Sequence, residues 1–141
     1  MASQPTILII DDDFEIVSLL LEVLRHDGHE ADSACDPVEG MKKVRQVKPD
    51  LIILDYHMPQ TTGAHLYESL RRNQASATTP ILFMSGEASP ETIMAEITDS
   101  SDARFLPKPI HLEDFRNAVK AMLSGEKSDG SLSSETPEKP A

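Results

Sequence analysis

The sequence predicts an α/β domain with a doubly wound, five-stranded parallel sheet, and two observations lead to this prediction. Short apolar runs recur along the chain without alternating with polar residues, which is typical of strands covered on both faces. Between these runs, apolar residues repeat at three and four positions, as in helices that bury one side. The 141 residues, of which 39% are hydrophobic, suffice for one such domain.

The expected strands are four apolar runs and one weaker segment. The runs are Ile7–Ile10, Leu51–Leu54, Ile81–Met84 and Phe105–Leu106, and the weaker candidate is Glu30–Cys35. Each run is too short for a helix. Because strands alternate with helices and crossovers between parallel strands are right-handed, we expect the strand order 2-1-3-4-5 with helices on both faces.

Two of the expected helices begin with a proline in the first turn. Asp36 can cap the earlier one, and Glu39 can reach back to that cap. This helix ends before Pro49, and its inner face is expected to hold Val38, Met41, Val44 and Val47. The later one opens with Ser89-Pro90-Glu91 and continues through Ile93, Met94 and Ile97.

Two further helices are predicted from their apolar stripes. Asp13 can cap the first, and Gly28 ends it. Its stripe is Val17, Leu20, Leu21 and Leu24, and that of the last helix is Phe115, Ala118, Val119 and Met122. From Ser124 to Ala141 this periodicity stops. We therefore expect a domain over residues 1–123 and a disordered tail or linker remnant over residues 124–141.

Charge and cysteine content exclude several classes of protein. The formal net charge is -11, and lysines and arginines are scattered singly or in pairs, which argues against a nucleic-acid surface. No segment has the form of a signal peptide or a membrane span, so neither export nor membrane insertion is expected. Cys35 is the only cysteine, which excludes an internal disulfide and favours the cytoplasm. A lone cysteine is usually a small buried or half-buried side chain.

Polar residues follow the apolar runs at the edge where ligands collect in a parallel sheet. Asp11 and Asp12 follow the first expected strand, Asp55 the third and Ser85 the fourth, and Lys108 lies just beyond the fifth. Crowded carboxylates repel one another, and one lysine cannot neutralise three of them. A hard divalent cation can, and Mg²⁺ characteristically binds carboxylates, waters and a phosphate. A carboxylate beside such an ion can attack phosphorus and form an aspartyl phosphate.

Four motifs occur in order among the predicted elements: IIDDD at the end of the first strand, LDYHMPQTTG around Asp55, FMSGE around Ser85, and FLPKP around Lys108. With these motifs the chain resembles the receiver domains of bacterial response regulators, from about Thr6 to about Leu123. The resemblance implies a flavodoxin-like (βα)5 fold. It also implies a two-component phosphorylation switch that catalyses only its own phosphorylation and dephosphorylation.

The resemblance assigns roles residue by residue. Asp55 would be the phosphoacceptor, and Lys108 would grip the phosphoryl group. The Mg²⁺ would be bound directly by Asp12 and mainly through water by Asp11. Asp55 itself and the backbone carbonyl of His57 would complete the protein's ligands.

Further roles concern switching and the lifetime of the phosphoryl group. The resemblance implies that the Ser85 hydroxyl follows the phosphoryl group and that the Phe105 ring changes rotamer on activation. The side chains of His57 and Glu87 would tune hydrolysis. Pro109 would follow a cis peptide bond, which an X-Pro sequence makes accessible. The remaining histidines share no metal-ligand spacing and are expected at the surface: His26, His29, His65 and His111.

The implied partners are a histidine kinase or phosphotransfer protein and a downstream protein that the sequence does not identify. Neither dimerisation nor attachment to a longer regulator can be predicted. Two alternatives remain open. Asp11-Asp12-Asp13 contains the Asp-x-Asp element of haloacid-dehalogenase-like phosphatases, although Glu15 stands where their threonine is expected. The chain could also be a pseudo-receiver that binds proteins without being phosphorylated.

Overall fold

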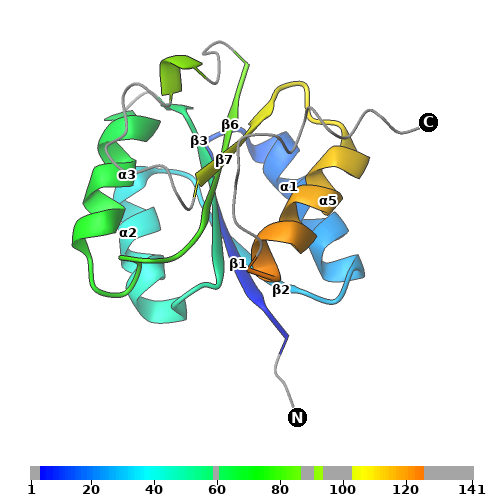
Figure 1. Ribbon diagram of the computed structural model, residues 1–141, viewed down its shortest axis with the longest axis horizontal. Helices are drawn as coiled ribbons and strands as arrows, with labels where there is room; N and C mark the ends of the chain where they lie inside the picture. Colours follow the sequence, from blue (N-terminus) through cyan, green and yellow to red (C-terminus); the bar gives the residue numbers. More distant parts are fainter. Residues whose placement is uncertain (1–3, 59–60, 87–90, 94–102, 126–141) are drawn as a thin grey trace.

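Five parallel strands form the central sheet of the computed structural model, which describes residues 4–58, 61–86, 91–93 and 103–125 (Figure 1). The strands are β1 (Thr6–Ile10), β2 (Glu30–Ala34), β3 (Leu51–Asp55), β6 (Ile81–Ser85) and β7 (Ala103–Pro107). Their order across the sheet is β2-β1-β3-β6-β7, and all four pairings are parallel. This confirms the expected order 2-1-3-4-5.

Helices cover both faces of the sheet. In Figure 1, α1 (Phe14–His26) and α5 (Leu112–Leu123) lie on one side, while α2 (Pro37–Val47) and α3 (Gly63–Arg72) lie on the other. Successive residues of a strand point to opposite faces. Accordingly, Ile7 and Ile9 pack into the core beneath α1 and α5, while Leu8 and Ile10 pack into the core beneath α2 and α3. The two aliphatic cores explain why the strands are apolar on successive residues.

The predicted helix signals act mostly as expected. The Asp13 carboxylate accepts from the backbone N–H groups of Glu15 and Ile16, and Asp36 caps α2 by accepting from the Glu39 N–H. Gly28, with φ of 94°, follows the end of α1. The Glu39 carboxylate accepts from the N–H of Cys35, one residue before the cap, so the predicted contact with the cap residue itself is displaced by one position.

Two predictions about burial were wrong. Val38 was expected on the inner face of α2, yet it is 78% exposed. Gly40 and Val44 are the buried residues of this helix. At 100° per residue, Val38 lies about 200° around the helix from Gly40 and therefore faces solvent. Cys35 is exposed rather than buried, because it lies in the turn between β2 and α2.

Three elements were not predicted by residue. Helix α3 is capped by the Thr62 hydroxyl, which accepts from the His65 N–H, and it buries Leu66, Tyr67 and Leu70. Before it, β4 (His57–Met58) and β5 (Thr61–Thr62) form a short antiparallel ladder. Their sequence, rich in polar and turn residues, offers too little periodicity for a prediction.

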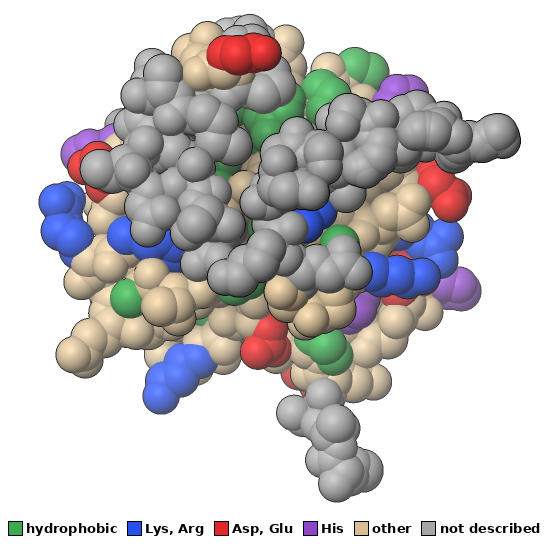
Figure 2. All heavy atoms as spheres, viewed as in Figure 1, with side chains coloured by type: hydrophobic (Ala, Val, Ile, Leu, Met, Phe, Trp, Pro, Cys, Tyr) green, Lys and Arg blue, Asp and Glu red, His purple; other side chains and the backbone are tan. Residues whose placement is uncertain are grey.

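Some sequence predictions fall outside the described residues. Residues 91–93 are helical, but Ser89, Pro90, Met94 and Ile97 of the predicted later helix are not described, and neither is the tail from residue 126 onward. No helix in the described part of the chain combines the length and apolarity of a membrane span. On the face drawn in Figure 2, Lys and Arg side chains are visible at several places around the molecule.

Candidate functional site

Three carboxylates meet at the carboxyl ends of two neighbouring strands. Asp55 is the last residue of β3, and Asp11 and Asp12 directly follow β1. The register pairs Ile10 with Leu54, which brings the residues after these positions side by side. Carboxylate oxygens of Asp11, Asp12 and Asp55 all lie within 4.8 Å of one another. The sequence prediction that these acids share one pocket therefore agrees with the geometry.

Local backbone groups orient two of the carboxylates. Asp11 is 1% exposed and Asp55 is 4% exposed, whereas Asp12 lies at the surface. Asp11 Oδ1 accepts from the Asp13 N–H at 2.9 Å, and Asp55 Oδ1 accepts from the His57 N–H at 3.3 Å. Each is an aspartate bonded to the amide two residues ahead, a local turn that only these short side chains readily form.

Lys108 brings a positive charge to the same pocket. Its Nζ lies 3.3 Å from Asp11 Oδ2 and 3.5 Å from Asp55 Oδ1. The residue is anchored by its own backbone, because its N–H donates to the carbonyl oxygen of Ser85 at 2.8 Å. The Lys108–Pro109 peptide bond is cis. Thus the end of β7 is tied to the end of β6 at the point where the ammonium group turns towards the acids.

The charges of the pocket do not balance. Burial and, after it, the neighbouring Asp11 carboxylate raise the pKa of Asp55 to about 7, although Lys108 and the His57 N–H act to lower it. Burial alone would lower the pKa of Lys108, but the carboxylates of Asp11 and Asp55 outweigh it and raise that pKa. Among the described residues, Lys108 is the only cation within ion-pair distance of these acids. Three ionised carboxylates and one ammonium leave two negative charges uncompensated.

The donor set fits a small divalent cation. Mg²⁺ prefers carboxylate oxygens at 2.0–2.1 Å, so two of its ligands lie at most about 4.2 Å apart. The three carboxylates are already close to that spacing. A charge of +2 would neutralise the two uncompensated negative charges of the pocket. Because Asp12 is exposed, the cation site would be open to water and to a phosphate on that side. Asp11, Asp12 and Asp55 could therefore hold Mg²⁺.

The other predicted site residues are placed as follows. Ser85 ends β6 next to this pocket and is 2% exposed. The exposed ring of His57 stacks edge-to-face with that of Tyr56, with centroids 5.3 Å apart, while its backbone lies beside Asp55. Phe105 lies within β7, half-buried against the core beneath α2 and α3. Glu87 lies outside the described residues.

The sequence analysis did not predict the packing of Tyr56, the residue after Asp55, against Gly63. Tyr56 is buried, and its carbonyl oxygen accepts from the Gly63 N–H at 2.6 Å. A Cβ at position 63 would come within 2.8 Å of the Tyr56 Cα, so only glycine allows this approach. The glycine at the end of LDYHMPQTTG was the available signal, but its neighbour could not be identified without the fold.

Comparison with known proteins places the chain among signalling proteins. Residues 7–120 match the response regulator receiver domain family. The transcriptional regulatory protein PrrA of Mycobacterium leprae is 31% identical over 134 residues, which cover 95% of this chain and 56% of that protein. The DNA-binding dual master transcriptional regulator RpaA of Synechocystis is 32% identical over 119 residues, which cover 84% of this chain and 49% of that protein. The chain spans about half the length of these curated relatives.

A solved structure shows the same arrangement over nearly its full length. The chemotaxis protein CheY4 of Vibrio cholerae superposes with a TM-score of 0.78 at 28% identity, covering 85% of this chain and 99% of that one. The family comprises domains that carry out chemistry on themselves and not enzymes that act on a separate substrate. The match over residues 7–120, the sheet order and the acidic pocket with Lys108 lead to one conclusion: this chain belongs to the response regulator receiver domain family.

Proposed function

We propose that the chain is a phosphorylation-dependent signalling switch in which Asp55 accepts a phosphoryl group in the presence of Mg²⁺. The observation that carries the proposal is the convergence of Asp12, Asp55 and Lys108 in one pocket, with acidic oxygens within 4.8 Å of one another and the ammonium 3.5 Å from Asp55. A nucleophile, a cation site and a fixed positive charge are the parts that phosphoryl transfer requires.

The proposed chemistry follows from the charges in the pocket. An oxygen of the ionised Asp55 attacks phosphorus, the bond from phosphorus to the donor breaks, and the donor leaves with the electron pair. When bound, Mg²⁺ supplies positive charge that stabilises the transferring oxygens. Lys108 already contacts Asp55, and it would move its ammonium onto the new phosphoryl oxygens. Because the pKa of Asp55 is about 7 without metal, a cation beside it would also favour the ionised nucleophile.

Within this proposal the remaining residues have supporting roles. Asp12 binds the ion directly, Asp11 binds it mainly through water, and the His57 carbonyl completes the set. The Ser85 hydroxyl is the group that follows the phosphoryl oxygens, because it lies at the end of the strand next to β3. We further assign the rotamer change to Phe105 and control of hydrolysis to His57 and Glu87. These assignments rest on the receiver-domain motifs around each residue.

Labelling with a small phosphodonor tests the assignment of Asp55. The purified chain is incubated with acetyl phosphate and Mg²⁺, and its intact mass is measured. Wild type should gain the mass of one phosphoryl group, whereas Asp55→Asn should not. Asp114→Asn, an exposed carboxylate on α5 that undergoes the same chemical change, should label like wild type. Equal labelling of the Asp55→Asn variant would rule out Asp55 as the acceptor.

The partners in the proposal are a histidine kinase or phosphotransfer protein and a downstream protein whose affinity depends on phosphorylation. Beryllofluoride, which mimics a phosphoryl group, would activate the switch without a kinase. A partner captured only when it is present would be the output. A cytoplasmic location is part of the proposal, since the single cysteine of the chain is a free, exposed thiol that suits a reducing compartment.

Different observations bear on the two alternative functions, a phosphatase and a pseudo-receiver. Membership of the receiver family argues against a haloacid-dehalogenase-like phosphatase. Such enzymes also need a later acidic pair, and the candidates for it in this chain, Asp99 and Asp102, lie outside the described residues. The pseudo-receiver alternative is decided by the metal. Saturable Mg²⁺ binding that disappears in Asp12→Asn supports the switch, while no binding at millimolar Mg²⁺ supports a module that is never phosphorylated.

A further inference from the structure

Strand β2 forms one edge of the sheet, and half of its backbone groups point away from β1. The Glu30 N–H donates to the Pro5 carbonyl, and the Ala34 carbonyl accepts from the Asp11 N–H, so these alternate residues face β1. The N–H and C=O of one strand residue point to the same side. The backbone groups of Ala31 and Ser33 therefore face outward. Such unpaired groups are a template for another strand.

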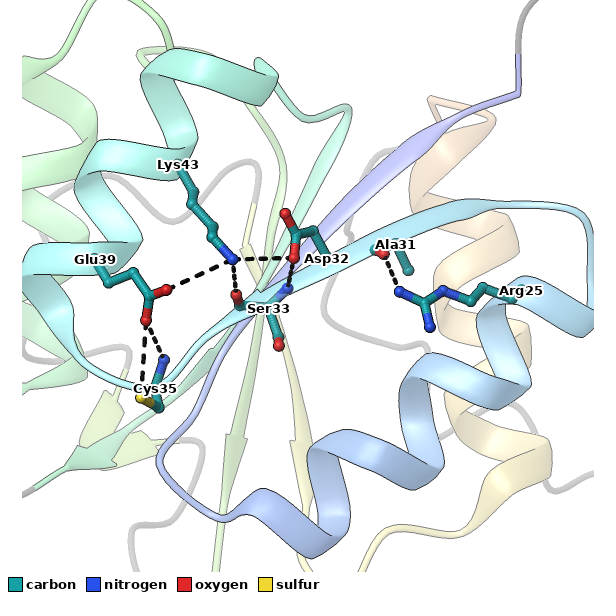
Figure 3. A network of polar contacts seen from close by, with 7 residues as sticks. All are labelled: Arg25, Ala31, Asp32, Ser33, Cys35, Glu39 and Lys43. Carbon is teal, nitrogen blue, oxygen red and sulfur yellow. Dashed lines mark hydrogen bonds and ion pairs between the residues drawn. The ribbon is translucent and has the colours of Figure 1, made fainter.

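The outward groups of Ser33 are occupied by two charged side chains. The Asp32 carboxylate accepts from the Ser33 N–H at 2.8 Å, and the Lys43 ammonium donates to the Ser33 carbonyl at 2.6 Å. Lys43 and Asp32 also form an ion pair, with Nζ 3.0 Å from Oδ1. Figure 3 shows Lys43 reaching down from α2 to this point of the strand. Both backbone groups of one outward residue are thus covered by a single ion pair.

A second cation covers the carbonyl group of the other outward residue. Arg25 extends from α1 and donates from Nη2 to the Ala31 carbonyl at 2.8 Å (Figure 3). Since α1 and α2 lie on opposite faces of the sheet, the two cations reach the same edge from both sides. Glu39, one helical turn before Lys43, lies 3.6 Å from its ammonium and helps to hold it in place. Arg25, Asp32 and Lys43 together form what we call the β2 cap.

We propose that the β2 cap keeps the outer edge of β2 from pairing with the β2 of a second copy of this chain. The edge itself is self-complementary. Two β2 strands that meet antiparallel about Asp32 would place Ala31 opposite Ser33 in both directions, and each pair would exchange its N–H and C=O bonds. The cap opposes this by occupying the Ala31 carbonyl and both backbone groups of Ser33 with side chains from the same molecule.

Asp32 adds a second obstacle to pairing. In the antiparallel arrangement it would lie directly opposite its own copy, and like charges opposite each other are unfavourable. With Lys43 removed, these two carboxylates would lose their counter-ion. The β2 cap therefore opposes pairing through occupied backbone groups and also through charge.

The test is the molecular mass of folded variants in solution, measured by sedimentation at matched concentrations. Arg25→Met with Lys43→Met removes both cations but keeps the bulk of their stems. Adding Asp32→Thr also removes the facing carboxylates. We expect the triple variant to associate at least about tenfold more tightly than wild type, because it frees the backbone groups of the edge and removes the facing carboxylates. The double variant should associate less tightly than the triple variant, because its Asp32 carboxylates face each other without a counter-ion.

A matched control separates the cap from the loss of charge. Lys42→Met with Arg45→Met makes the same substitutions at two exposed positions of α2 and should leave the mass as in wild type. Ser33→Pro, added to the triple variant, deletes the outward N–H and should reverse the association, since proline is tolerated where an edge N–H faces solvent. Association that survives Ser33→Pro, or a triple variant that is folded and no larger than the control, overturns the proposal.

A measurement on the wild type covers the case in which the variants do not fold. Hydrogen exchange of the Ser33 amide should be slowed about tenfold or more relative to a free amide, although it lies on the outer edge of the sheet, because Asp32 holds it. Unprotected exchange at Ser33 would show that the cap does not exist in solution.

Discussion

At the scale of single residues, the chain keeps an excess of negative charge in a buried place. Asp11 and Asp55 are both buried, and Lys108 reaches both, but Asp12 lies beside them. The stabilities of this pocket and of the whole protein therefore depend on protonation and on cations. Residues that are useful for the proposed chemistry are here unfavourable for folding in the absence of metal.

Replacing Asp55 should stabilise the metal-free protein in a pH-dependent way. The folded pKa is about 7 and the unfolded value is near 3.8, so between these limits the folded state binds more protons. The contribution of Asp55 to the free energy of unfolding is fully present below about pH 4, and it is lost as the pH rises through 7. The free energy of unfolding of Asp55→Asn should then exceed that of wild type by roughly 2–4 kcal/mol at about pH 8, and the two should differ little near pH 4.

Urea denaturation at several pH values measures this difference. Added Mg²⁺ should shrink it, because the ion stabilises wild type and binds the variant poorly. A gain of the same size at every pH would show that the pocket does not perturb Asp55.

Titration of His29 should change the free energy of unfolding with pH in the opposite direction to that of Asp55. His29 was expected at the surface, but it is half-buried, its Nδ1 has no hydrogen-bond partner among the described residues, and burial lowers its pKa. The unfolded state then binds the proton first as pH falls below about 6.5, so the free energy of unfolding decreases with acidification. His29→Gln should lose less stability than wild type between about pH 7.5 and 5.5. The exposed His26→Gln serves as the control and should follow wild type.

At the scale of elements, backbone approach decides where the helices lie. Two helical glycines lie close to the sheet: Gly40 of α2 packs against Ile10 of β1, and Gly63 of α3 packs against Tyr56, which directly follows β3. The position of Gly40 explains why Val38 faces solvent, since the helix turns its glycine side towards the sheet. Sequence periodicity identified α2 and placed Val44 correctly on its inner face, but it assigned Val38 to that face wrongly, because Gly40 contributes no hydrophobic signal.

The two glycines should differ sharply when replaced by alanine. A Cβ at Gly63 would meet the Tyr56 backbone Cα at 2.8 Å, whereas a Cβ at Gly40 would meet the tip of the Ile10 side chain, Cδ1, at 2.8 Å. A side-chain tip can move, but the backbone next to Asp55 cannot move without disturbing the site. Gly63→Ala should therefore cost about 1–3 kcal/mol, and Gly40→Ala less than about 1 kcal/mol because alanine also favours the helix.

Thermal unfolding and acetyl phosphate labelling of both variants check this prediction. Gly63→Ala should also slow labelling of Asp55, while Gly40→Ala should not. Equal destabilisation of the two variants would mean that the Tyr56 backbone yields as easily as the Ile10 side chain.

At the scale of the whole molecule, two hydrophobic cores lie on either side of one sheet. The core beneath α1 and α5 includes Phe115, Val119 and Met122, so the last helix is part of the domain up to its end. There, the Ser124 N–H donates to the Lys120 carbonyl and the Gly125 N–H to the Met122 carbonyl. These backbone hydrogen bonds end the helix at Gly125.

Truncation should define where the domain ends. A chain that stops after Gly125 keeps the buried Met122 and the closing hydrogen bonds, so it should unfold at the same midpoint as the full chain and label equally well. A chain that stops after Lys120 loses Met122, which is 5% exposed, and should lose about 2–5 kcal/mol. Circular dichroism melts of both chains measure the effect. A lower midpoint for the first would assign a structural role to residues 126–141, against the predicted tail.

The sequence by itself determined the strands, most of the helices, the sheet order and the set of acidic and basic residues at one edge. These follow from local patterns: apolar runs, helical stripes, capping residues and the position of polar residues after each strand. The motifs around Asp55, Ser85 and Lys108 identified the family for the same reason, since each is a short local string.

Only the tertiary structure decided which residues meet across the fold. In the structure, Lys108 contacts Asp11 and Asp55, and Tyr56 packs against Gly63. Helix α2 packs Gly40 against Ile10, which leaves Val38 facing solvent. The tertiary structure also placed Arg25 and Lys43 on the same strand edge from opposite faces. Distances between residues far apart in the chain depend on how helices are seated on the sheet, and this is set by side-chain volumes in contact, which no local pattern records.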